Sequence, residues 1–261
     1  MNVLLTNDDG IDAPGLRALV QCLSEKVNLR VVAPASERSA SSHSISLGQK
    51  LRVEEFFEDS IRKWMVHGTP ADCVKFAVSE LKDFRADLVI SGINQGANTG
   101  VSVYYSGTIS AAREALINGI PSVAVSLASG TFENFGIAAS FVKRFVEGCG
   151  SRKFPSEVML NVNIPALAEN KIKGVKITKQ AASRFIEEFV KEKQHDGKRV
   201  YTLVGEMEIL DPDGTSDEEA VSGGYISVTP LKLDLTDYAA MPIFEKWMGN
   251  QRRRKAVCRR Q

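Results

Sequence analysis

Cysteine is scarce in this chain of 261 residues, and no CxxC pair occurs, which excludes the usual zinc-binding and redox motifs. The N-terminus has no basic region and reaches the acidic pair Asp8 and Asp9 early, so we expect no signal peptide. Unpaired thiols without a signal peptide predict a reducing, cytoplasmic location. The four cysteines are Cys22, Cys73, Cys149 and Cys258.

Long apolar runs and an excess of charge are also missing. No run approaches the roughly 18 apolar residues of a membrane-spanning helix, so no membrane partner is expected. The 33 basic and 32 acidic side chains leave a net charge of +1, which excludes a dedicated nucleic-acid binder with a dominating positive field. The basic end, residues 251–261, predicts a solvated, frayed tail; the alternative is an RNA or membrane-surface contact.

The familiar nucleotide and hydrolase signatures are absent. The glycines at 92, 96, 100 and 107 do not fit GxGxxG, and no Walker A lysine follows them. No GxSxG nucleophile elbow occurs, which disfavours a serine hydrolase. Any phosphate chemistry must therefore use another arrangement of residues.

Short apolar runs alternate with helical patterns through the first half of the chain. This alternation predicts an α/β fold of the doubly wound, Rossmann-like type, with a mainly parallel sheet. The carboxyl ends of parallel strands meet at one edge, where open sheets bind their ligands. The apolar runs are Val3–Thr6, Leu29–Ala33, Asp87–Ser91 and Pro121–Ser126.

The last third, about residues 155–240, is predicted to form hairpins attached to the sheet and to contact a second subunit. Its acidic stretch, residues 211–219, is expected to be an exposed turn. With no repeats and no low-complexity linker, we expect one domain over residues 1–250. The strands expected in this third are Val158–Ile164, Val175–Thr178, Arg199–Gly205 and Tyr225–Leu231.

Polar motifs follow the first two strands directly. Asn7-Asp8-Asp9-Gly10 offers two adjacent carboxylates, which suit a divalent cation such as Mg²⁺ or Mn²⁺; helix capping and an Asx turn are the alternative. Residues 36–44 hold five serines and His43, which are either ligands for an ion or parts of a plain hydrophilic loop.

A long loop follows the strand at residues 87–91 and runs to Ser106-Gly107-Thr108 at a helix start. Its backbone N–H groups and hydroxyls are typical of a phosphate site. Tyr104 and Tyr105 either stack on a base or pack against the loop. Together, the three strand ends predict metal-assisted phosphoryl chemistry.

Seven motifs in order resemble the SurE (survival protein E) family of 5′/3′-nucleotidases and acid phosphatases. The resemblance spans about residues 2–240. One departure is Ser42, where many relatives have glycine. The motifs are Asn7-Asp8-Asp9-Gly10, Glu37-Arg38-Ser39-Ala40 with His43-Ser44, Gly68-Thr69-Pro70-Ala71-Asp72-Cys73-Val74, Ser91-Gly92-Ile93-Asn94-Gln95-Gly96, Ser106-Gly107-Thr108, Asn161-Val162-Asn163-Ile164-Pro165, and Thr229-Pro230-Leu231 with Asp234 and Thr236.

The resemblance implies hydrolysis of nucleoside 5′- and 3′-monophosphates with one divalent cation, Mg²⁺ or Mn²⁺, and a homodimer or homotetramer. Its metal ligands fall on Asp8, Asp9, Ser39 and Asn94. Its substrate-phosphate contacts fall on Asn94, Gly96, Ser106, Gly107 and Thr108.

Several roles stay open at this stage. Asp8 or Asp9 is a candidate base, and His43 is either the acid that protonates the leaving group or a residue that stabilises its loop. Thr69, Pro70 and Asp72 predict a helix start, against a direct role at the site. Alternative functions are a broad acid phosphatase or exopolyphosphatase, and a non-catalytic metal or nucleotide sensor.

Overall fold

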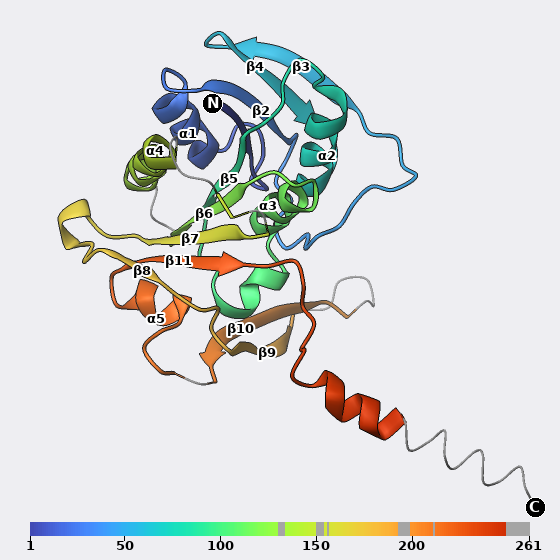
Figure 1. Ribbon diagram of the computed structural model, residues 1–261, viewed down its shortest axis with the longest axis vertical. Helices are drawn as coiled ribbons and strands as arrows, with labels where there is room; N and C mark the ends of the chain where they lie inside the picture. The colour runs from blue at the N-terminus through green and yellow to red at the C-terminus, as the bar shows by residue number, and fades with distance from the viewer. Residues whose placement is uncertain (130–133, 150–153, 156, 193–198, 211, 249–261) are drawn as a thin grey trace, which may run out of the picture. The chain divides into compact units, whose positions relative to one another are not determined.

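The computed structural model describes residues 1–129, 134–149, 154–155, 157–192, 199–210 and 212–248. The chain divides into two compact units, with the boundary between Leu231 and Lys232. The first unit contains a nine-stranded sheet in the order β3-β4-β2-β1-β5-β6-β7-β11-β8 (Figure 1). Its strands are β1 (Asn2–Thr6), β2 (Asn28–Pro34), β3 (Val53–Glu58), β4 (Ile61–Val66), β5 (Leu88–Gln95), β6 (Ser122–Ala128), β7 (Met159–Pro165), β8 (Val175–Ile177) and β11 (Ile226–Leu231).

Strands β4, β2, β1, β5, β6 and β7 are mutually parallel, whereas β3 and β11 run antiparallel to their neighbours β4 and β7. Helices cover both faces. The predicted α/β, mainly parallel, doubly wound fold is therefore confirmed. The helices are α1 (Pro14–Leu23), α2 (Pro70–Glu80), α3 (Gly107–Ile117), α4 (Gly136–Cys149) and the short α5 (Asp217–Ser222), with 3-10 turns η1 (Gly100–Tyr104) and η2 (Glu169–Lys171).

An apolar layer lies on each face of the main sheet and packs against a pair of helices. Helices α1 and α4 pack on one face and α2 and α3 on the other, as Figure 1 shows. Strand β1 is buried on both faces, as its unbroken apolar run predicts. Helix α1 begins at Pro14 and buries Leu16, Leu19, Val20 and Leu23, the spacing of one helical face.

Close packing holds the start of α1 against the end of strand β5. A Cβ atom built on Gly15 would lie 2.0 Å from the carbonyl oxygen of Ile93 in β5, so only glycine fits there. Strand β1 lies between β2 and β5, and the chain leaves β1 toward β2 on one side and returns through β5 on the other. The carboxyl ends of β1 and β5 therefore flank the topological switch point of the sheet.

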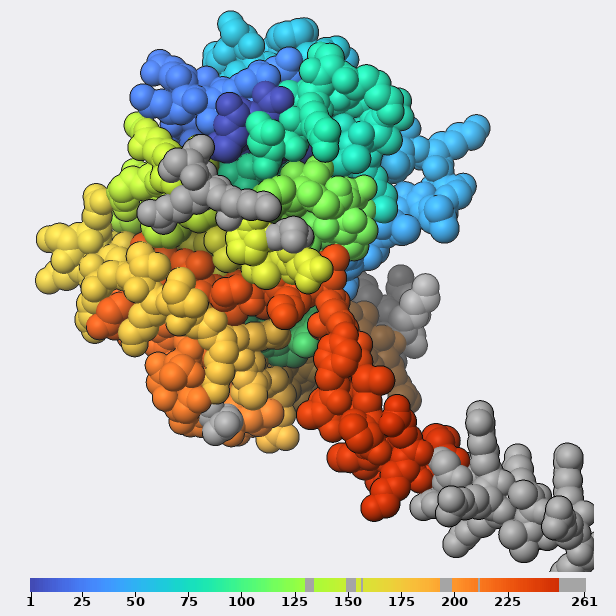
Figure 2. Space-filling model, in the orientation of Figure 1, coloured from blue at the N-terminus to red at the C-terminus, as the bar shows by residue number. Residues whose placement is uncertain are grey.

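The C-terminal hairpin extension expected from the sequence is confirmed, but other strands of the last third belong to the main sheet. Strands β7, β11 and β8 extend the main sheet, and its one hairpin among the described residues is β9 (Ser183–Lys191) with β10 (Tyr201–Ile209). Strand β9 was not expected from the sequence. Figure 2 shows the yellow and orange residues of β8 and α5 gathered on one side of the first unit.

The acidic stretch, residues 211–219, matches the expected exposed turn only in part: residues 212–215 are exposed and irregular, but the expectation was wrong from Ser216 onward. Helix α5 begins there, with Ser216 as its N-cap in a capping box with Glu219. Asp217 is fully buried. Its carboxylate accepts hydrogen bonds from the backbone amides of Gly100 and Ala181, at 3.1 and 2.9 Å for the shortest contacts.

The second unit is described over residues 232–248. The Thr236 amide donates to Asp234 at 2.9 Å, and residues 241–248 are helical. In that helix the Phe244 and Trp247 rings pack edge to face, 5.0 Å between centroids. The basic tail lies outside the described residues, and the single domain over residues 1–250 stays a prediction. Among the described helices, none is long and apolar enough to cross a membrane.

Candidate active site at the carboxyl edge of the sheet

The turn after β1 is built by Asn7. Its buried amide group donates from Nδ2 to the Gly10 carbonyl at 2.8 Å and accepts from the Gly10 amide at 3.3 Å. Gly10 has φ of +106°, a conformation that favours glycine. Asn7 thus shapes the turn, and the turn leaves the carboxylates of Asp8 and Asp9 at the sheet edge.

Asp8 is held against the start of α3. Its side chain is 4 % exposed, and its Oδ1 accepts a hydrogen bond from the Thr108 hydroxyl. A Cβ atom on Gly107 would lie 2.7 Å from the Asp8 Cβ, so a glycine is needed where the helix begins. Burial raises the pKa of Asp8 above its ordinary value, although the Thr108 hydrogen bond acts in the opposite direction.

Asp9 lies beside Asp8 and is half-buried. Burial, followed by the charges of Asp8 and Glu37, raises the pKa of Asp9 to about 7. None of the ion pairs in the described part of the chain includes Asp8 or Asp9. Among the described residues, the carboxylates of this site thus have no ion-pair partner.

The serine-rich loop after β2 reaches the same place. The Arg38 amide donates to the Asp8 carbonyl at 2.7 Å, which anchors the loop, and the exposed Ser39 hydroxyl bonds Glu37 at 2.5 Å. Glu37 is a third carboxylate at the site that the sequence reasoning missed. It lies two residues before Ser39 in the quoted motif, so the motif itself carried the signal.

Ser42 takes a backbone conformation that glycine adopts most easily. Its φ is +52°, in the left-handed region that glycine adopts at least cost. Here the Ser42 amide donates to the Tyr105 carbonyl at 2.9 Å and its hydroxyl to the Tyr104 carbonyl at 2.8 Å. These two bonds tie the serine loop to the end of η1.

Strand β5 supplies Asn94 from the other side of β1. The pairing of β5 with β6 shifts register between Ser91 and Asn94, which turns the end of the strand. Asn94 donates from Nδ2 to the Gly96 carbonyl at 2.8 Å, so its Oδ1 is the atom offered as a ligand. The Gly96 amide donates to the Leu127 carbonyl at 2.9 Å and is therefore already used within the protein.

Helix α3 starts at the centre of the site. Ser106 is its N-cap, with Oγ accepting from the Ile109 amide at 3.2 Å. The first-turn amides of such a helix carry a partial positive charge that favours a phosphate. The Thr108 hydroxyl donates to Asp8; its expected contact with phosphate stays a prediction.

His43 contacts a buried carboxylate in the middle of α3. Its Nε2 lies 2.9 Å from Oε2 of Glu114, which is 2 % exposed and also accepts from Lys75 at 2.8 Å and Asn118 at 3.0 Å. This arrangement favours the interpretation that His43 stabilises its loop; the acid role stays a prediction. Glu114, in the middle of α3, was not identified from the sequence because no local motif marks its partners.

Thr69 and its neighbours form the predicted helix start. Thr69 and Asp72 make a reciprocal capping box at the start of α2, with Pro70 in the first turn. Asp72 also accepts from the amide and hydroxyl of Ser46, at 3.0 and 2.7 Å. The motif thus fastens the far end of the serine loop.

Part of this site opens into one cavity of about 460 Å³; of the residues predicted from the sequence, Asp8, Ser39, Asn94 and Ser106 line it, whereas Asp9, His43, Gly96, Gly107 and Thr108 do not. It is lined by groups from the sheet edge, from η1 and the start of α3, and from the β9–β10 hairpin. The residues that matter here are Asp8, Ser39, Asn94, Tyr105, Ser106, Phe185, Glu187 and Leu203.

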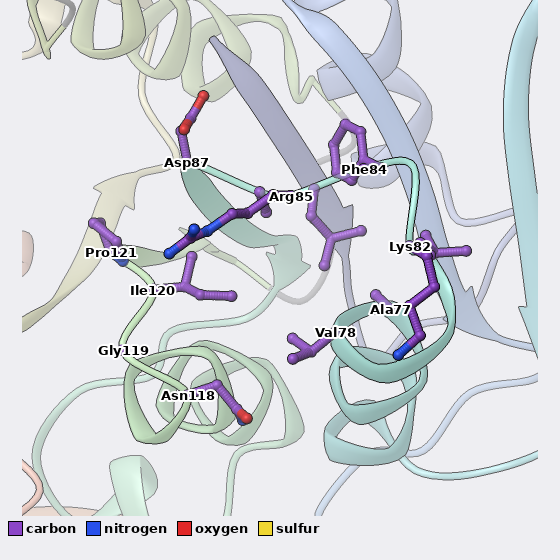
Figure 3. Close-up of a pocket in the computed structure, with 13 residues that line it drawn as sticks. Ala77, Val78, Lys82, Phe84, Arg85, Asp87, Asn118, Gly119, Ile120 and Pro121 are labelled. Atoms are coloured by element: carbon purple, nitrogen blue, oxygen red, sulfur yellow. The ribbon is translucent and has the colours of Figure 1, made fainter.

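A larger cavity, about 660 Å³, lies at the opposite edge of the sheet (Figure 3). It is bordered by the residues before β5 and β6 and by the ends of α2 and α3, including Val78, Arg85, Asn118 and Ile120. None of the site residues predicted from the sequence lines it. Open α/β sheets bind ligands at the carboxyl edge, so we assign the chemistry to the smaller cavity.

The donor set fits a hard divalent cation. Asp8, Asp9, Ser39 and Asn94 offer only oxygen ligands, which suit Mg²⁺ and Mn²⁺. A bound cation would also balance the two carboxylates whose pKa values are raised. Within the described ranges no cluster of three or more His, Cys, Asp or Glu side chains is arranged to hold a metal ion.

Comparison with known proteins shows the family of this chain. A family model described as "Survival protein SurE" matches residues 3–187. The chain belongs to the SurE family. The resemblance drawn from the sequence motifs is therefore confirmed.

SurE relatives match over nearly the whole chain. Two proteins named "5′-nucleotidase SurE" are similar: one from Trichormus variabilis, 44% identical over 95% of this chain and 98% of its own, and one from Moorella thermoacetica, 45% identical over 92% and 93%. The crystal structure of the SurE protein from Aquifex aeolicus is 36% identical, with a TM-score of 0.82 over 95% of this chain and all of that one.

Proposed function

We propose that this site hydrolyses nucleoside 5′-monophosphates to nucleoside and phosphate, and that 3′-monophosphates are a second substrate class. The protein is thus a 5′-nucleotidase of the SurE family. The observation that carries the proposal is one cavity that is lined by the buried Asp8, by Ser39 and Asn94, and by Ser106, the N-cap of α3. The names of the SurE relatives support the nucleotide as substrate.

Oxygen atoms of Asp8, Asp9, Ser39 and Asn94 would hold one divalent cation, Mg²⁺ or Mn²⁺. When bound, it supplies Lewis-acid chemistry at the phosphoryl group. The protein's own groups do the rest. The Ser106 hydroxyl and the first amides of α3 bind the phosphate and orient it, and Asp8 or Asp9 orients the attacking water.

Thr108 acts here through Asp8. Its hydroxyl fixes the Asp8 carboxylate by donating to Oδ1, so the second oxygen, Oδ2, faces the start of α3. Asn94 has its amide nitrogen engaged by Gly96, which leaves its oxygen oriented as a ligand. Both contacts keep the ligands in place before substrate arrives, which lowers the reorganisation needed for reaction.

Phosphate release from 5′- and 3′-nucleoside monophosphates, in Mg²⁺, Mn²⁺ or excess EDTA, tests the proposal. We expect release that EDTA abolishes. Asp8→Asn should weaken metal binding at least about ten-fold, with a parallel loss of turnover. Asp12→Asn is the matched control, because Asp12 lies in the same segment with its side chain 81% exposed.

The alternatives give different results. Release from p-nitrophenyl phosphate or polyphosphate that exceeds release from nucleotides would favour a broad phosphatase. Nucleotide binding without release, in folded protein and with each metal, would favour a sensor. Full turnover of Asp8→Asn at ordinary Mg²⁺ would refute the ligand assignment. A homo-oligomer and a cytoplasmic location stay predictions, the first checked by light scattering.

A further inference from the structure

The β9–β10 hairpin is fastened beside the proposed site at its base. The Ser183 hydroxyl accepts from the Val101 amide of η1 at 2.8 Å. A Cβ atom on Gly100 would lie 2.2 Å from that Ser183 oxygen, so the close approach requires glycine. The buried Asp217 carboxylate bridges the amides of Gly100 and Ala181 on either side of the junction. Figure 1 shows the hairpin next to η1.

Alternation along β9 turns one row of side chains toward the cavity. Phe185 and Glu187 line it from β9, and Leu203 lines it from β10. The residue paired with Glu187 across the hairpin is Gly205, which has no side chain. A Cβ atom on Gly205 would lie 2.6 Å from the Ile186 carbonyl oxygen and 3.1 Å from Cγ of Glu187, so β9 and the Glu187 side chain pack closely against this glycine.

Two aromatic rings face each other across the junction of hairpin and loop. The Tyr105 and Phe185 ring centroids are 6.2 Å apart, with 49° between the ring planes. Tyr105 is 52% exposed and Phe185 36% exposed, although both line the cavity that contains Asp8, Ser39 and Asn94. Partly exposed aromatic faces beside a phosphate site are suited to stack on a flat heterocycle.

We propose that Tyr105, Phe185 and Leu203 form a nucleoside wall, on which the base of the substrate packs while its phosphate lies at the start of α3. This inference rests on the function proposed above and names the part of the protein that recognises the base. Glu187 supports the orientation, because its carboxylate repels the phosphate from the hairpin end of the cavity.

The test compares AMP with ribose 5-phosphate, which has the same phosphate and sugar without the base. In the metal-loaded enzyme, Phe185→Ala should raise KM for AMP and lower kcat/KM about ten-fold, the effect of losing one stacking contact. For ribose 5-phosphate, kcat/KM should change less than about two-fold. Phe185→Leu, which keeps apolar volume, should show the same selective loss to a smaller degree.

Phe189→Ala is the matched control. Phe189 lies on the same face of β9, is 71% exposed and packs on Tyr201 at 6.5 Å between centroids, outside the residues that line the cavity. It should leave both substrates unchanged. An equal fall in kcat/KM for both substrates in Phe185→Ala, or an unchanged kcat/KM for AMP, would refute the proposed nucleoside wall. Failure of the unaltered enzyme to release phosphate from either substrate would refute the proposed function instead.

Discussion

Asp9 makes the metal-free protein less stable as the pH rises. Its pKa in the folded chain is about 7, against an ordinary value of 3.8, because burial and the charges of Asp8 and Glu37 disfavour its ionised form. Between these two values the folded chain binds more protons than the unfolded chain. The free energy of unfolding therefore falls as pH rises from about 4 to about 7, and this contribution is constant above that range.

The size of the effect follows from the pKa difference of about 3 units. At about 1.4 kcal/mol per unit, full expression would give about 4 kcal/mol. Asp9 is partly exposed, and water screens its charge, so we reduce this to about 2 kcal/mol. In EDTA, Asp9→Asn should therefore exceed the unaltered protein in free energy of unfolding by about 2 kcal/mol at pH 8 and by no more than about 0.5 kcal/mol at pH 4.5.

Urea denaturation at the two pH values measures this difference. Asp12→Asn, which removes an exposed carboxylate of the same segment, should show no comparable dependence on pH. A stability gain in Asp9→Asn that is equal at pH 4.5 and pH 8 would refute the reasoning, since the gain would then not come from ionisation. Adding Mg²⁺ at pH 8 should stabilise the unaltered protein and not the variant.

Three further changes test the supports of the site. Gly107→Ala places a Cβ atom 2.7 Å from the Asp8 Cβ, so it should lower the free energy of unfolding by about 1–3 kcal/mol and weaken metal binding measured by calorimetry. Gly148→Ala, whose Cβ would have no atom within 4 Å, should change neither quantity. Equal behaviour of the two variants would contradict the packing argument. Thr69→Ala removes the cap of α2 and should lower the free energy of unfolding by about 1 kcal/mol, measured in urea; an unchanged midpoint would count against the capping box. Glu114→Gln should lower the free energy of unfolding by about 1–3 kcal/mol and reduce kcat/KM, because the Glu114 carboxylate binds His43 and Lys75. A free energy of unfolding equal to that of the unaltered protein would show that these bonds contribute little.

The helices and strands whose formation depends on residues a few positions apart in the sequence were predictable. The apolar run of β1 needs burial on both faces, and Pro14 and Pro70 fix helix starts through their own backbone geometry. Strand β9 was missed because Glu187 and Glu188 interrupt its apolar pattern, and it stands in a two-stranded sheet apart from the main one. The buried N-cap of α5 was missed because the surrounding acidic residues read as solvent-exposed.

By itself the sequence determined the parallel sheet and the chemical types of residue at its carboxyl edge, since strand periodicity and end-of-strand motifs depend on residues a few positions apart. Only the tertiary structure decided how those residues are held. His43 meets Glu114 and Asp8 meets Thr108 across 71 and 100 positions of sequence. Phe185 reaches Tyr105 only because the hairpin is fastened to η1. Such contacts depend on chain topology and close packing, which no local pattern of residues encodes.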